Sequence, residues 1–284
     1  MDNKKVIINM FTKRQISLAL RSFGNVVLGV VVMFVLVACS DLGERDNPLD
    51  PAAWGYEPSL KSPFECNLEN WNAKRDAYNT KWIRNGFGLH SASVVTDPRD
   101  KNIYRTVVIN DMRVFAENLR YADSAASVNL KSQTWCYNNE EKNCKIGGRY
   151  YTWTAAMNLD SEWRFMDASN LIRKQHQGIC PDGWHIPNNA EWNTLFRGVG
   201  YASQQMKDFN GWEMATDSSG FSALPVGYYR NGVFNEVGSH ACFWSATEER
   251  ESGRADFWML KRDFAGLANF SKSDGLAIRC VQNN

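Results

Sequence analysis

The sequence predicts an α+β domain in its larger, C-terminal part. Three observations carry this prediction: a hairpin signal, two helix signals, and a series of short apolar runs separated by Gly, Asn, Ser and Asp, which is typical of antiparallel strands joined by loops. The 284 residues are 44% hydrophobic and include 11 tryptophans. This composition supports one substantial core and excludes a disordered chain.

The individual elements follow from local patterns. A hairpin is predicted over 104–116, because Asn110 and Asp111 between two apolar runs tolerate the positive φ of a two-residue turn. Helices are predicted over 151–157 and 189–199, and Asn188 with Glu191 can form a reciprocal capping box at the start of the second. The short apolar runs predict strands over 220–229, 242–247, 256–261, 267–270 and 276–281.

Residues 1–38 predict a secretory signal peptide that ends at a lipidation site. Five basic residues and one acidic residue precede an apolar run over 26–37, which is too short for a helix to span a bilayer of roughly 30 Å. The run ends with Ala38 before Cys39, which resembles the lipobox of bacterial lipoproteins; either Met1 or Met10 can be the start. The resemblance implies cleavage before Cys39 and lipidation of its sulfur, and several acyl chains anchor a protein stably.

The residues after Cys39 predict where in the cell envelope the protein is located. Ser40 resembles the sorting pattern of outer-membrane lipoproteins, and the acids at 41, 44 and 46 resemble a surface-export signal. We therefore expect an outer-membrane lipoprotein, exposed at the cell surface, whose lipid anchor makes the membrane a partner. The formal net charge is +1 without a basic cluster, so nucleic acid is not expected as a partner.

The mature chain divides into three segments. The segment 39–63 contains four of the eight prolines, which disfavour helix and central strand, so it is interpreted as a tether. The segment 64–96 is an accessory segment in which Trp71 and Trp82 lie at helical spacing. The α+β domain occupies 97–284.

The six cysteines left after lipidation predict disulfide bonds. An even number in an exported protein indicates a disulfide framework, and fifteen pairings are open. No Cys-x-x-Cys pair is present and the four histidines are scattered, so we expect no metal and no cofactor. The six are Cys66, Cys136, Cys144, Cys180, Cys242 and Cys280.

Seven stretches between residues 97 and 282 resemble, in order, the Fibrobacter succinogenes major paralogous domain. The stretch CPDGWHIPNNAEW is also similar to a motif of formylglycine-generating-enzyme-like proteins. These resemblances imply a C-type-lectin-like domain in which two helices pack on a hairpin and small antiparallel sheets, stapled by disulfides. The stretches are RVFAENLRYADS (113–124), WCYNN (135–139), GRYYTWTAAMN (148–158), HQGICPDGWHIPNNAEWNTL (176–195), GFSALPVGYY (220–229), FWSATE (243–248) and AIRCVQ (277–282).

The resemblance also implies how the cysteines pair. Cys180 is expected to pair with Cys280, and Cys136 with Cys144. Cys66 lies outside the domain, and Cys242 stands where the family usually has an aromatic residue. We expect these two to pair with each other, and the alternative is two free, buried thiols.

Three functions are compatible with these patterns. The first is a noncatalytic surface module for binding or adhesion, with plant-wall polysaccharide or another glycan as its ligand, because aromatic rings stack on sugars. The candidate ligand contacts are Tyr228, Tyr229, Trp244 and Trp258. The second is an envelope domain for structure or protein interaction.

The third function, a formylglycine-generating-enzyme-like oxidase, is the weakest. It needs a reactive cysteine pair that holds copper, whereas Cys242 and Cys280 are far apart in sequence and each has another expected partner. His185 and Glu191 can be interpreted as an acid-base couple or as a hydrogen-bonded core histidine and a helix cap. We expect no catalytic residues.

Overall fold

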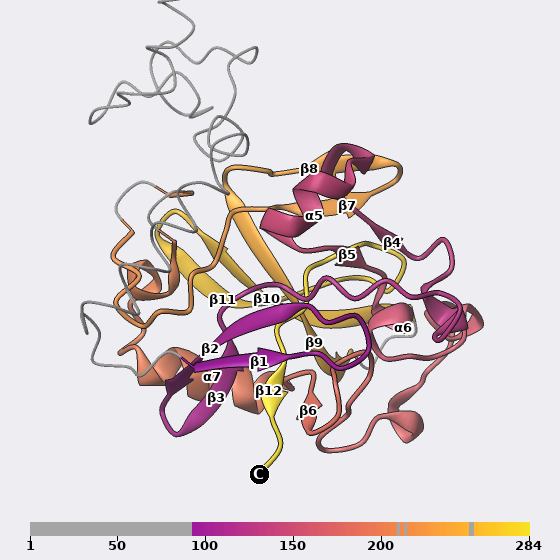
Figure 1. The fold of residues 1–284 in the computed structure, drawn as a ribbon, viewed down its shortest axis with the longest axis horizontal. Coiled ribbons are helices and arrows are strands. Elements are labelled where there is room, and N and C mark those ends of the chain that lie inside the picture. Colours follow the sequence, from indigo (N-terminus) through magenta and orange to yellow (C-terminus); the bar gives the residue numbers. More distant parts are fainter. Residues whose placement is uncertain (1–92, 209–210, 213–214, 250–252) are drawn as a thin grey trace, which may run out of the picture. The chain divides into compact units, whose positions relative to one another are not determined.

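Two antiparallel sheets form the framework of the domain (Figure 1). The structure is a computed structural model that describes residues 93–208, 211–212, 215–249 and 253–284. The predicted signal peptide, Cys39, the tether, Cys66 and the predicted helix around Trp71 and Trp82 lie outside the described residues.

The larger sheet joins the first and last described strands of the chain. Its hairpin turns at Asn110 (φ 49°) and Asp111 (φ 65°), which confirms the predicted hairpin. The edge strand comes from the segment 64–96 and pairs with its neighbour over all four of its residues. The strand order is β1 (Ser93–Thr96), β2 (Ile103–Ile109), β3 (Met112–Phe115), β12 (Val281–Gln282) and β6 (Trp184–His185).

The second sheet is a three-stranded meander of the last third of the chain. The predicted strands 242–247, 256–261 and 267–270 lie within it, and each is longer than predicted. Two two-stranded ribbons complete the sheets. The meander consists of β9 (His240–Glu248), β10 (Arg254–Lys261) and β11 (Phe264–Ser271), and the ribbons pair β4 (Thr134–Trp135) with β5 (Tyr150–Tyr151) and β7 (Tyr228–Arg230) with β8 (Val233–Asn235).

Two predicted strands are wrong over most of their length. Only 228–229 of the run 220–229 and only Val281 of the run 276–281 belong to strands. The second run changes partners at successive residues: Leu276 bridges to Tyr151 and Ala277 to Phe243. Its backbone is therefore hydrogen-bonded without forming a continuous ladder.

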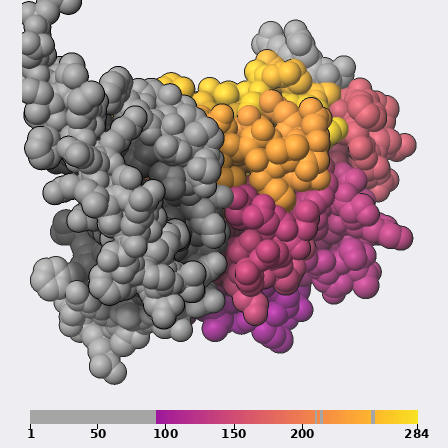
Figure 2. Space-filling model, turned by 90° about the horizontal axis from the view of Figure 1, so that it is seen from above, coloured from indigo at the N-terminus to yellow at the C-terminus, as the bar shows by residue number. Residues whose placement is uncertain are grey.

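The described residues contain three helices, one more than predicted. They are α5 (Glu141–Gly147), α6 (Trp153–Ala156) and α7 (Asn189–Gly198). The capping box of α7 is confirmed, since Asn188 and Glu191 bond each other's backbone N–H groups. The unexpected helix α5 contains Cys144, whose disulfide to Cys136 ties it to the preceding loop, and its polar sequence carries no helical periodicity. Figure 1 draws α5 beside the β7–β8 ribbon, and Figure 2 shows this face in magenta and orange. Just before the helix, Tyr137 packs edge-on against Phe234 of β8, with ring centroids 5.3 Å apart.

The core is aromatic and also encloses charged side chains. Trp192 of α7 lies on Phe243 and Trp258, with ring centroids 5.6 and 6.1 Å apart. Arg279 is 1% exposed and donates to the carbonyls of Phe115 and Phe221 at 2.9 and 2.7 Å. It therefore holds the β2–β3 hairpin and the loop at 220 together through hydrogen bonds.

One buried carboxyl makes the stability of the fold depend on pH. Burial, together with the negative charge of Asp208, raises the pKa of Asp217 from 3.8 to about 7. The carboxyl therefore binds a proton more tightly in the folded state than in the unfolded state. As a consequence, the free energy of unfolding increases as pH falls from about 7 towards 4, and this gain is lost as pH rises through about 7.

We expect Asp217→Asn to stabilise the protein at pH 8, by on the order of 2 kcal/mol, and to make no such gain at pH 4 to 5. The amide keeps an acceptor for the Ser222 backbone N–H that the carboxylate binds at 2.8 Å. Thermal unfolding at several pH values measures this, with the exposed Asp263→Asn as control. An equal effect at both pH values would contradict the prediction.

Candidate functional site

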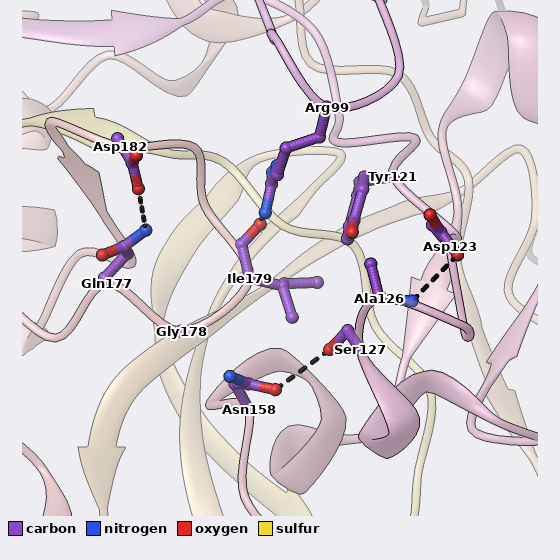
Figure 3. A pocket seen from close by; sticks show the side chains of 10 residues that line it. All are labelled: Arg99, Tyr121, Asp123, Ala126, Ser127, Asn158, Gln177, Gly178, Ile179 and Asp182. Carbon is purple, nitrogen blue, oxygen red and sulfur yellow. Dashed lines mark hydrogen bonds between the residues drawn. The ribbon is translucent and has the colours of Figure 1, made fainter.

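A pocket of about 440 Å³ opens between four loops near the Cys180–Cys280 disulfide (Figure 3). We call it the Arg99 pocket. Most of its lining side chains can form hydrogen bonds, which suits a polar ligand. It is lined by Arg99, Tyr121, Asp123, Ala126, Ser127, Asn158, Gln177, Gly178, Ile179 and Asp182.

Arg99 is held in a fixed orientation. Its Nε and Nη2 donate to the two carboxylate oxygens of Asp97 at 2.9 and 2.6 Å, and Nη2 also donates to the carbonyl of Ile179 at 2.9 Å. Its guanidinium lies 3.8 Å from the ring centroid of Tyr121, within cation-π range. Burial lowers the pKa of Arg99, but the hydrogen bond to Asp97 and the charges of Asp97 and its neighbours together outweigh burial and raise the pKa above its ordinary value. Arg99 therefore remains charged and paired.

The floor of the pocket is rigid because the chain passes very close to α6. Gly178 has φ 54°, and a Cβ there would collide with the carbonyl oxygen of Ala156 and with Ile186. Ile179 donates its N–H to the same carbonyl at 2.9 Å. The next residue, Cys180, is in the disulfide to Cys280. The floor is thus fixed before a ligand arrives.

The walls present polar groups that are already oriented. Gln177 donates to Asp182 at 2.9 Å, and Ser127 donates to Asn158 at 3.0 Å, as Figure 3 shows. The carboxylate of Asp123 accepts the backbone N–H groups of residues 125 and 126 with one oxygen. The second carboxylate oxygens of Asp123 and Asp182 accept no hydrogen bond from the described residues and remain available to a ligand.

The predicted aromatic site is not assembled. Trp244 and Trp258 are 0% and 2% exposed and belong to the core, so the expectation that they contact a ligand is corrected. The reason is that both faces of β9 and β10 are packed: Trp244 lies beside Phe257 on one face and Trp258 beside Phe243 on the other, each in a core cluster of its own. Tyr229 stacks on Trp135 at 4.3 Å and Tyr228 packs edge-on against Phe270 at 4.8 Å, so both half-buried rings are engaged within the protein.

His185 is a hydrogen-bonded core histidine, which is the second of the two interpretations that the sequence left open for it. It is 1% exposed, and its two ring nitrogens lie 2.8 Å from oxygens of Glu191 and Asn283. Burial lowers the pKa of His185, but the hydrogen bonds to these two residues and the charge of Glu191 together outweigh burial and raise the pKa. Glu191 also caps α7. With both nitrogens engaged, His185 has no position from which to take a proton from a substrate.

The two disulfides implied by the resemblance are present, Cys136–Cys144 and Cys180–Cys280. Cys242 is fully buried and has no disulfide partner among the described residues; Cys66, with which we expect it to pair, lies outside them, so this pairing stays a prediction. Cys242 lies in the stretch 241–246 of β9, where the residues on both faces are buried, and burial raises the pKa of its thiol well above the ordinary value. A thiol of this kind is unreactive.

Glu141 lies beside the Cys136–Cys144 disulfide. Among the described residues, these three form a group whose side-chain types can bind a metal ion. The two sulfurs are bonded to each other, and thiolates are the form that binds metal. Glu141 is in addition paired with Arg149 at 2.8 Å. With the disulfide formed, these residues tie α5 to the preceding loop and offer no thiolate to a metal ion.

Fold and site together define a disulfide-stapled α+β domain with a rigid polar pocket at its surface. The chain belongs to the Fibrobacter succinogenes major domain family, whose model matches residues 107–282. No curated protein and no solved structure matches the chain significantly.

The Arg99 pocket was missed at the level of sequence. Its residues come from loops at 97–102, 121–130, 156–158 and 176–182, which lie side by side only in the folded chain. The one local signal was Asp97-Pro98-Arg99, an acid and a base two residues apart. Such pairs are common at surfaces, so this signal alone does not indicate a site.

Proposed function

We propose that this protein is a noncatalytic lipoprotein of the cell surface whose C-type-lectin-like domain binds a glycan in the Arg99 pocket. The observation that carries the proposal is the pocket: about 440 Å³, a fixed floor and several polar side chains already oriented. Amide, carboxylate and hydroxyl groups of this kind bind sugar hydroxyls, and oriented groups bind with a smaller entropy cost. Plant-wall polysaccharide is one such ligand.

The state of the cysteines and of His185 supports a noncatalytic role. A copper-dependent oxidase would need two thiolates together, whereas Cys280 is in a disulfide and Cys242 is a buried thiol. His185 uses both nitrogens within the fold. Oxidation of a cysteine-containing peptide by the pure protein with copper would overturn this part of the proposal.

The lipid anchor is the basis of the proposed location. The sequence before Cys39 has the order of a lipoprotein signal, basic residues, a short apolar run and a small residue before cysteine. Among the residues that the structure describes, no helix has the length and apolarity needed to cross a bilayer.

We expect Cys39→Ser to abolish acyl labelling and to release the protein from the membrane fraction, because the thioether carries the lipid. Metabolic labelling with a fatty acid and detergent partitioning measure this. Ser40→Ala, one residue away, is the control and is expected to keep both properties. Unchanged partitioning of Cys39→Ser would contradict the proposal.

Glycan binding is tested on the full chain. We expect retention of the protein on at least one polysaccharide or oligosaccharide of a glycan array that includes cellulose and xylan fragments, and loss of at least tenfold in affinity for Ala126→Trp, since the ring would fill the pocket. Ser218→Trp, at an exposed position outside the pocket, is the matched control. Binding that Ala126→Trp leaves unchanged would place the site elsewhere and overturn the proposal.

One observation favours the alternative of a protein-interaction domain. Phe165, Met166 and Leu171 are 72%, 40% and 41% exposed and lie within seven residues of one another. Apolar side chains grouped at a surface are typical of interaction sites. Absence of retention on every glycan would favour this alternative.

A further inference from the structure

We propose that the Arg99 pocket selects sugars by charge: it accepts uncharged, hydroxyl-rich sugar residues and excludes those that carry a carboxylate, and Asp123 and Asp182 set this selectivity. This inference rests on the proposed glycan-binding function and names the chemical class of its ligand.

The arginine of the pocket does not act as a receptor for anions. Asp97 is 0% exposed and meets the guanidinium with both carboxylate oxygens. The carbonyl of Ile179 takes up a further N–H. Asp97 therefore compensates the charge of Arg99 inside the protein, and only Nη1 of the guanidinium makes no hydrogen bond to the described residues.

The groups that remain for a ligand include donors, Nη1 of Arg99 and Nδ2 of Asn158, but the uncompensated charges among them are two carboxylates. Asp123 and Asp182 each use one carboxylate oxygen within the protein and keep the second free of hydrogen bonds from the described residues. Gln177 uses its amide N–H₂ in bonds to Asp182 and to the carbonyl of Cys180, which leaves its carbonyl oxygen as an acceptor. A sugar hydroxyl can donate to such oxygens, whereas a carboxylate cannot donate and is repelled by them.

The aromatic ring of the pocket does not offer a stacking face. Tyr121 is 2% exposed, and the guanidinium of Arg99 covers its ring. Recognition in this pocket must therefore come from hydrogen bonds, and the charges of Asp123 and Asp182 distinguish neutral from anionic sugars. The pocket volume of about 440 Å³ lies in the range of sites for small ligands, so we expect a chain end or a short segment to enter.

The test compares the affinities of the full chain, in detergent, for cellohexaose, xylohexaose and hexagalacturonate by isothermal titration calorimetry. We expect binding of a neutral hexamer and roughly tenfold weaker binding of the anionic one, from two like-charge repulsions at a surface. Added salt should reduce the difference, because it screens these charges.

The double variant Asp123→Asn/Asp182→Asn keeps the shape and the internal hydrogen-bond acceptors but removes both charges. We expect it to bind hexagalacturonate about as well as the neutral hexamers. Asp111→Asn/Asp263→Asn removes two exposed charges outside the pocket and is the matched control, which should retain the discrimination of the wild type.

The outcomes separate the two proposals. Wild-type affinity for hexagalacturonate equal to that for the neutral hexamers, or discrimination that survives in Asp123→Asn/Asp182→Asn, overturns the charge selection and leaves glycan binding in place. Retention of no saccharide, in this series and on the glycan array, overturns the proposed function and the selectivity with it.

Discussion

Removal of the Cys180–Cys280 disulfide by Cys180→Ala/Cys280→Ala is expected to cost about 4.7 kcal/mol of unfolding free energy, the chain-entropy value for a loop of 100 residues. Domains of this size are stable by about 5–15 kcal/mol, so the variant should lie close to unfolding. The same change loosens the floor of the Arg99 pocket, since Ile179 precedes Cys180 and binds Arg99. Urea-induced unfolding measures the free energy.

The local disulfide is the matched control for this experiment. Cys136→Ala/Cys144→Ala opens a loop of 8 residues, for which the same relation gives about 2.5 kcal/mol. We expect the long-range bridge to contribute clearly more than the local one. A cost for Cys180→Ala/Cys280→Ala that does not exceed the cost for the local bridge would contradict the expectation.

Lys272→Met is expected to cost about 3–5 kcal/mol, because it leaves a buried carboxylate without its counter-charge. Lys272 and Glu248 are 0% and 3% exposed and form an ion pair. The ammonium also donates to the carbonyls of Trp163 and Met166, at 3.1 and 2.6 Å, and the carboxylate accepts the N–H of Ala168 at 2.8 Å. The pair thus fastens the loop 161–168 to the second sheet.

A double-mutant cycle tests this explanation. We expect Lys272→Met/Glu248→Gln to lower the free energy of unfolding by less than the sum of the two single substitutions, because the double variant contains no unpaired buried charge at this site. The exposed Lys131→Met should change the unfolding free energy by less than about 0.5 kcal/mol. Additive single effects, or a loss below about 1 kcal/mol for Lys272→Met, would show that the pair is not coupled.

Local patterns were sufficient for elements whose partners are close in sequence. The hairpin depends on Asn110 and Asp111, which adopt a positive φ themselves. The start of α7 depends on Asn188 and Glu191, which bond each other's backbone. By contrast, α5 carries no helical periodicity and the run 276–281 changes partners along its length. Their conformations depend on contacts with distant residues, and local patterns do not contain those contacts.

The sequence by itself determined the α+β class, the strands of the second sheet, the capping of α7 and the family. Each depends on residue type or short-range periodicity. Only the tertiary structure decided that Trp244 and Trp258 are core residues, that Cys242 is fully buried, and that four loops enclose the Arg99 pocket. The physical reason is that burial and pocket geometry depend on which distant segments meet, and 100 residues separate even the two cysteines whose bond fixes the floor of the pocket.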